Sequence, residues 1–329
     1  MFQPGYVLIV LASAVLGLQL YSKTFVQPPM GALFESYLNS CAYSKSNPFY
    51  SIICVLEPLF KDLVGNEIAK SFMTACGTVG AVMSTYLFLK GGEPGASPAL
   101  SPLITIAHTL AGQFFGAGIV GPILLPLIMV LSKTYAPRNA PSPSPPTYAY
   151  TVTLLFMQFT VFSLAMALSG VPPTSASWPY VNYAFQAFPL LFLPLALFPT
   201  HTKAKGNSTT PPPTPIPTLS ISTFTVMKYL YGPLWWVTLA QGLNAYFRLG
   251  ETFSPACRFI ALDYIGFVWT FVAMYAVDAV AGEAQVAMSV QRLLISFVAT
   301  GPASTMAAYF EAKQRLVVER AESERARKG

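Results

Sequence analysis

Long apolar runs separated by polar or proline-rich segments dominate the chain. Eight runs have the length and composition of membrane-spanning helices: 6–20, 71–89, 103–131, 148–168, 183–198, 227–247, 259–282 and 287–310. A helix needs about 20 predominantly apolar residues to cross the hydrocarbon core of a bilayer. The pattern therefore predicts an all-α fold, a polytopic helical bundle with seven or eight transmembrane helices.

Two of the apolar segments need separate interpretation. The run 103–131 is long and holds Pro122 and Pro126 late in its course, which predicts one kinked helix rather than two. The segment 49–60 is too short to span, so we expect a re-entrant or interfacial segment, or one end of a tilted helix. The first run, 6–20, has no basic residues ahead of it, which favours a transmembrane helix over a cleaved signal peptide.

Proline-rich segments and a charged tail set the domain organisation. We predict loops at 133–147 and 199–222, within a single transmembrane domain covering 1–310, and a charged, solvent-exposed tail at 311–329. Asn207 begins an acceptor triplet for N-glycosylation, which is usable only if its loop is lumenal. Orientation is not decided, because eight alternating spans spread the loop lysines and arginines over both sides.

Composition excludes several classes of protein. Hydrophobic residues make up 53% of the chain and charged residues 10%, against about 25% charged in a soluble domain. The formal charge is +6, but no basic run with interleaved aromatics indicates nucleic acid. Four cysteines without CxxC spacing and only two histidines argue against a metal centre. We therefore expect no metal and no cofactor, and a partner that is lipid or a lipophilic small molecule.

The run 259–282 carries two carboxyl groups, from Asp263 and Asp278. An acid inside hydrocarbon is costly unless it is neutral, paired or hydrated, and by default it marks a functional site. At 100° per residue one helix face presents, in order, Asp263, Phe267, Thr270, Met274 and Asp278. That face could line a binding site for a lipophilic substrate that reacts by proton transfer. Both acids are therefore catalytic candidates.

Each acid also has a simpler interpretation. Asp263 is placed to pair with Arg258, or with Arg248 in the preceding segment, and Asp278 lies near a membrane face where water can reach it. Arg292 is either a counter-ion to Asp278 or Glu283, or a residue whose charged group extends to the interface. These alternatives stay open at the level of sequence.

Glu57 is a third catalytic candidate. It precedes Pro58 in an apolar segment, and the proline can bend the chain so that the carboxyl group is aimed into a cavity. The alternative is a local ion pair with Lys61, four positions later in a helix.

Aromatic residues are abundant in the last third of the chain and could stabilise cations through their ring faces. Trp235 and Trp236 have the character of an interfacial aromatic belt. The better candidates for substrate binding share the acid-bearing run: Tyr264, Phe267, Trp269, Thr270 and Tyr275.

Missing motifs narrow the chemistry. The sequence has no DDxxD, no paired aspartate clusters that would hold magnesium, no DxDD, and no Walker, GxSxG or HExxH motif. What isolated acids can do alone is protonate an alkene or epoxide, or move protons in transport.

The chain resembles the membrane-bound terpene cyclases of fungal meroterpenoid pathways, of the type that makes ascofuranone, ascochlorin and macrophorin. The resemblance rests on length, on the span layout with proline-rich loops, and on the block NAYFRLGETFSPACRFIALDYIGFVWTF at 244–271. It implies cation-initiated cyclisation of a farnesyl-type chain on an aromatic or quinone-like head group. A protein carboxyl group would protonate an epoxide or alkene without metal, in a multi-pass protein of the endoplasmic reticulum.

Two alternatives remain. The same acids would serve a proton-coupled transporter of a lipophilic metabolite, although no repeat supports transporter architecture. A non-catalytic membrane scaffold with interfacial acids would lack a large concave pocket around Asp263. No pattern in the sequence predicts an oligomeric state.

Overall fold

The computed structural model describes residues 3–40, 48–134, 146–198 and 217–328, and every regular element within them is a helix. The long helices are α1 (Pro4–Tyr21), α4 (Glu67–Gly92), α6 (Ala117–Thr134), α7 (Tyr148–Gly170), α9 (Pro217–Phe247), α10 (Pro255–Val280) and α12 (Val290–Lys328). The shorter ones are α2 (Met30–Asn39), α3 (Pro48–Gly65), α5 (Pro102–Phe115), α8 (Trp178–Gln186) and α11 (Ala284–Ala287), with η1 (Ser22–Val26), η2 (Pro98–Leu100) and η3 (Phe188–Leu197).

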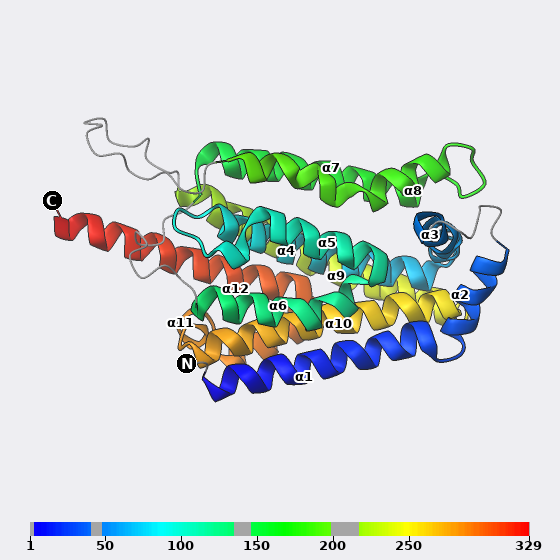
Figure 1. The fold of residues 1–329 in the computed structure, drawn as a ribbon, viewed down its shortest axis with the longest axis horizontal. Helices are drawn as coiled ribbons and strands as arrows, with labels where there is room; N and C mark the ends of the chain where they lie inside the picture. The colour runs from blue at the N-terminus through cyan, green and yellow to red at the C-terminus, as the bar shows by residue number, and fades with distance from the viewer. Residues whose placement is uncertain (1–2, 41–47, 135–145, 199–216, 329) are drawn as a thin grey trace.

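Seven helical stretches in the described residues are long and apolar enough to cross a membrane. They lie side by side along the long axis of the bundle, as Figure 1 shows, with both termini at the same end. The prediction of an all-α polytopic bundle is therefore confirmed, and the chain is a multi-pass membrane protein.

The two ends of the bundle are named here by the residues that meet there. The termini end holds Pro4, Gly92, Lys133, Pro217 and Val280, and the opposite end holds Tyr21, Glu67, Gly170, Trp178, Phe247 and Pro255. α3 is seen end-on at the opposite end in Figure 1, so it lies across the axes of the long helices. It is also not among the stretches able to span, in keeping with the interfacial segment expected there.

The run 103–131 forms two helices, so the prediction of one kinked helix was wrong. α5 ends and α6 begins at Gly116, whose φ is +85°, a conformation that glycine adopts readily because it has no Cβ. η2, which precedes α5, packs against α6, so the two helices are antiparallel and the chain reverses inside the bundle. The prolines Pro122 and Pro126 lie within α6 and do not end it.

A second reversal divides α12 at Gly301, whose φ is +78°. Thr305 Oγ1 donates a hydrogen bond to Ser296 Oγ at 3.1 Å. These residues are nine positions apart and would be separated by about 13 Å along a straight helix. The predicted span 287–310 is therefore a hairpin of two arms, 290–300 and 302–328, and both arms lead to the termini end.

Other boundaries also differ from the sequence prediction. α9 begins at Pro217, so the last part of the predicted loop 199–222 is helical. The predicted run 183–198 is the end of α8 followed by the 3-10 helix η3, which holds Pro189 and Pro194. Part of the predicted tail belongs to the bundle, because its first residues are buried: Glu311, Lys313, Gln314 and Val317. Asn207 lies outside the described residues.

Glycines allow α6 and α10 to touch backbone to backbone. A Cβ built on Gly118 would lie 1.8 Å from the carbonyl oxygen of Asp263, and one on Gly266 would lie 1.7 Å from the carbonyl oxygen of Gly118. No side chain can occupy that space unless the helices separate. This contact fixes the depth at which the α5–α6 reversal meets α10.

We expect Gly118→Ala to destabilise the protein, because forcing a methyl group into packed backbone costs roughly 1–3 kcal/mol or more. Gly77→Ala in α4 is the matched control, since a Cβ there would have nothing within 4 Å. Relief of glycine's entropy cost should leave that control neutral or stabilised by about 0.5–1 kcal/mol. Thermal unfolding in detergent measures both, and equal midpoints for the two variants would contradict the contact.

Candidate functional site

The acid-bearing face of α10 points into the bundle. Asp263, Thr270, Met274 and Asp278 are buried along it, as the helical spacing predicts, and Phe267 is half-buried. The helix begins with Ser254, whose hydroxyl accepts a hydrogen bond from the Cys257 backbone N–H, and Pro255 occupies its first turn. The two acids are fifteen positions apart and have different surroundings.

The side chain of Asp263, in α10, lies against the start of α6, beside the reversal at Gly116. Its Oδ1 accepts a hydrogen bond from the Gly118 backbone N–H at 2.6 Å, and its side chain is buried. Gly116 leaves room for the carboxyl group, because a Cβ there would lie 2.9 Å from Oδ1. The free N–H groups and the dipole at a helix N-terminus favour negative charge at this position.

Within the described part of the chain, Asp263 forms no ion pair. Arg258 and Arg248, the partners considered from sequence, are both exposed and make no described contact with it. The other buried acids there do have cationic partners: Glu93 with Lys90, Asp278 with Lys133 and Lys313, and Glu311 with Lys228 and Arg315. Asp263 is thus distinguished by burial without a countercharge.

Aromatic rings surround the residue next to Asp263. Tyr264 stacks on Trp235 of α9, with ring centroids 6.2 Å apart and planes at 20°, and meets Phe72 of α4 edge-on at 6.2 Å. Phe267 lies one turn further along α10, where a Cβ on Gly80 would come within 3.5 Å of its ring. Asp263, Tyr264 and Phe267 therefore share one region of the bundle.

The remaining predicted binding residues lie elsewhere. Trp269 is 37% exposed and donates from Nε1 to Ser13 Oγ of α1 at 3.2 Å, so it faces away from Asp263. Tyr275 donates to the Met288 carbonyl at 2.9 Å, near the termini end. Thr270 is fully buried and donates to the Gly266 carbonyl within its own helix at 2.8 Å. None of these three is brought to the Asp263 region by the fold.

Trp235 is the residue that sequence reasoning assigned differently. It has the character of an interfacial belt in sequence, yet its ring covers Gly301, where a Cβ would lie 2.4 Å away, and stacks on Tyr264. Trp236, by contrast, is exposed and donates to the Ala299 carbonyl at 3.0 Å, just before the reversal. Both tryptophans therefore contact the reversal at Gly301. Trp235 also contacts Tyr264, the residue that follows Asp263. No pattern in the sequence places Gly301 beside α9.

Asp278 lies in a buried ionic network at the termini end. It is 1% exposed, so water does not reach it as the sequence interpretation supposed. Its Oδ2 accepts from Tyr309 at 2.7 Å and from Lys313 at 2.6 Å, and Lys133 Nζ lies 2.9 Å from Oδ1. Glu283 completes the network through Lys133 at 2.8 Å and Lys313 at 3.5 Å.

This network joins the ends of α6 and α10 to the second arm of α12, and its two acids and two lysines balance in charge. Burial raises the pKa of Glu283, but the charges on Lys133 and Lys313 outweigh burial and leave that pKa below its usual value. Arg292, predicted as one possible counter-ion of Asp278, is exposed. Lys133 and Lys313 are the counter-ions instead. Lys313 also lies 5.5 Å from the centroid of the Tyr86 ring. We interpret this ionic network as a structural one that holds α6, α10 and α12 together.

Glu57 forms the local pair that its sequence position allows. Lys61 Nζ lies 2.9 Å from Oε1, and Tyr183 of α8 donates to Oε2 at 2.7 Å. Burial raises the pKa of Glu57, whereas the hydrogen bonds from Tyr183 and Lys61 lower it, and the net direction is downward. Both oxygens are occupied, so the geometry favours an ion pair that joins α3 to α8.

A pH dependence follows from the lowered pKa of Glu57. A carboxyl group with a lower pKa in the folded than in the unfolded state stabilises the fold above the unfolded pKa, near 4.5, and this contribution is lost as pH falls through the folded pKa. Glu57→Gln should therefore be less stable than the wild type at pH 7, and the difference should shrink below pH about 4.5. Thermal midpoints across pH 3–7 measure it, and a difference constant over that range would contradict the pairing.

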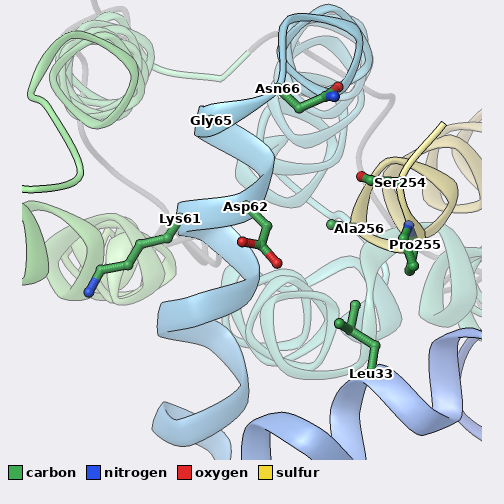
Figure 2. Close-up of a pocket in the computed structure, with 8 residues that line it drawn as sticks. All are labelled: Leu33, Lys61, Asp62, Gly65, Asn66, Ser254, Pro255 and Ala256. Atoms are coloured by element: carbon green, nitrogen blue, oxygen red, sulfur yellow. The ribbon is translucent and has the colours of Figure 1, made fainter. Parts of the chain in front are cut away.

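Two surface cavities among the described residues lie away from Asp263. One, of about 380 Å³, opens at the opposite end between α2, α3 and the starts of α4 and α10. Figure 2 shows Asp62 pointing toward the middle of this cavity and Lys61 pointing away. It is lined by Leu33, Lys61, Asp62, Gly65, Asn66, Ser254, Pro255 and Ala256. The other lies between α9 and α12, beside Thr225 and Arg315.

No group of three His, Cys, Asp or Glu side chains in the described ranges is placed to hold a metal ion. In comparisons with known proteins, no family model, curated protein or solved structure matches this chain.

Proposed function

We propose that the protein is an integral-membrane terpene cyclase. It protonates an epoxide or alkene of a prenylated, farnesyl-type aromatic or quinone-like substrate and guides the cyclisation of the cation, in meroterpenoid biosynthesis in the endoplasmic reticulum. The observation that supports this most is Asp263, a buried carboxyl group without a cationic partner among the described residues, in the residue before Tyr264, whose ring stacks on Trp235. The resemblance at 244–271 supplies the substrate class.

Asp263 is the proton donor in this proposal. Its proton passes to the epoxide oxygen, or to one alkene carbon, and the C–O bond or the π bond breaks to leave a carbocation. The carboxylate that remains accepts the Gly118 N–H at the N-terminus of α6, where negative charge is favoured. Burial without a cationic partner among the described residues favours the protonated acid before the reaction, and the helix start stabilises the carboxylate that forms as the proton leaves.

Tyr264, Trp235 and Phe267 are the residues proposed to stabilise the cation. A desolvated aromatic face is worth up to about 2 kcal/mol or more to a cation. Tyr264 follows Asp263 in α10, and its ring stacks on that of Trp235. Loss of a proton to a base, or capture by water, ends the sequence. Neither of these two cavities reaches Asp263, which is the result expected of the non-catalytic scaffold, so the cyclase proposal requires a movement that admits the substrate to Asp263.

The test is product formation by the purified protein in detergent, with no ion gradient and with an epoxyfarnesyl phenol as substrate. Protonation followed by proton loss is an isomerisation and gives a cyclised product of unchanged mass, whereas capture of the cation by water gives a cyclised product heavier by one water. A companion substrate with an alkene in place of the epoxide shows which group is protonated. Unchanged starting material with both substrates would refute the cyclase.

The two chain reversals favour a second candidate, a proton-coupled transporter of a lipophilic metabolite. Helices interrupted within the bundle, here at Gly116 and Gly301, are a feature of transporter binding sites. Proteoliposomes separate the candidates: a transporter accumulates the unmodified compound when a pH gradient is imposed, whereas the cyclase converts it without one.

A further inference from the structure

The two ends of the bundle differ in positive charge. Of the 19 lysines and arginines, six lie in elements at the opposite end or in the segment joining α2 to α3: Lys23, Lys45, Lys61, Lys70, Arg248 and Arg258. Of the others, Lys228 lies inside the bundle, eleven residues from the start of α9, where it pairs with Glu311, and the rest belong to elements or connecting segments at the termini end. Cytoplasmic segments of membrane proteins carry an excess of lysine and arginine close to their spans. The charge distribution therefore places the termini end on the cytosolic side.

This asymmetry depends on the two reversals. If 103–131 and 287–310 each crossed the membrane, their flanking segments would fall on alternating sides and the positive charges would be divided. Because the chain turns back at Gly116 and Gly301, both flanks of each hairpin lie at the termini end. Lys133 and Lys313 meet there around Asp278, which shows directly that these segments share one end.

An independent observation concerns the opposite end. Cys54, in α3, is disulfide-bonded, whereas Cys76 and Cys257 are free and buried in the bundle. Disulfides persist in oxidising compartments and are rare where cytosolic reductants reach them. α3 lies across the opposite end, so the disulfide and the scarcity of positive charge indicate the same side.

We propose that the termini end faces the cytosol and that the opposite end, with α3 and the Cys54 disulfide, faces an oxidising compartment. η3 ends and α9 begins at the termini end, so this proposal assigns the acceptor triplet at Asn207, which lies between them in sequence, to the side where N-glycans are not added. Asp263 is eight residues, about 12 Å, from the start of α10, and therefore lies in the half of the bundle nearer the oxidising side. The inference does not rest on the proposed function.

Thiol labelling in sealed microsomes, cytosolic face outward, tests this assignment in the full chain. Gln285→Cys introduces a thiol at the termini end and Ala176→Cys introduces one at the opposite end, both at exposed positions. With a membrane-impermeant maleimide we expect Gln285→Cys to be labelled in sealed vesicles and Ala176→Cys only after detergent. The wild type, whose free thiols Cys76 and Cys257 are buried, is the background control.

Two further measurements keep the assignment testable if either position labels poorly. Protease added to sealed microsomes should remove a C-terminal epitope tag, and a protected tag would overturn the assignment. Alkylation of the denatured chain should modify two of the four cysteines before reduction and all four afterwards. The reversed labelling pattern, labelling of both variants in sealed vesicles, or an endoglycosidase shift abolished by Asn207→Gln would each overturn it as well.

Discussion

Asp263→Asn is expected to reduce the cyclisation rate by roughly 10²–10⁴-fold, the usual contribution of a positioned general acid. The amide has nearly the shape of the carboxyl group, and its oxygen can still accept the Gly118 N–H, so α6 should keep its place against α10. What the variant lacks is the transferable proton. The measurement is the turnover of an epoxyfarnesyl phenol by the purified variant, beside a thermal midpoint that should stay close to that of the wild type.

Glu57→Gln is the matched control for that experiment. Glu57 is an acid in an apolar sequence, but both of its oxygens are engaged, by Lys61 and Tyr183. It should therefore retain cyclisation. Full activity in Asp263→Asn would remove Asp263 as the donor, and loss of activity in Glu57→Gln alone would transfer the role to Glu57. Loss in both variants with normal unfolding would show that two acids are needed.

Asp278→Ala is expected to cost about 3–5 kcal/mol of stability, because removing one partner from a buried ion pair leaves the other charge uncompensated. Of its two acidic partners among the described residues, Lys313 would keep Glu283, at 3.5 Å, and Tyr309 would lose its hydrogen-bond acceptor. Since the network ties α6, α10 and α12 together, the loss should appear in the unfolding of the whole bundle. A large drop in thermal midpoint in detergent is the expected result.

Lys70→Met provides the comparison, because Lys70 pairs with Glu67 at the partly exposed start of α4. Exposed pairs contribute about 0–1 kcal/mol, so this variant should unfold close to the wild type. If Asp278→Ala were no less stable than Lys70→Met, the network would not be the tie described here. Unchanged stability together with lost activity would instead return Asp278 to the list of catalytic candidates.

The candidate site was only partly predictable. Helical spacing correctly placed Asp263, Thr270, Met274 and Asp278 on one inward face of α10, because periodicity depends only on local geometry. It could not tell which acid has a countercharge. Lys133 and Lys313 approach Asp278 from other helices, from positions far away in sequence, and the expectation of a hydrated Asp278 failed for that reason.

The sequence by itself determined the class of protein, since apolar runs of this length leave only a membrane bundle, and it determined the inward face of α10. Tertiary structure alone decided that the chain turns back at Gly116 and Gly301, and hence which segments share an end. Glycine can adopt a positive φ because it has no side chain, but nothing requires it to do so. The hydropathy pattern is therefore the same for a hairpin and for a single span. Packing of α6 on α10 and of Trp235 on Gly301 decides between them. The same packing places Asp263 of α10 beside the start of α6, with no cationic partner among the described residues.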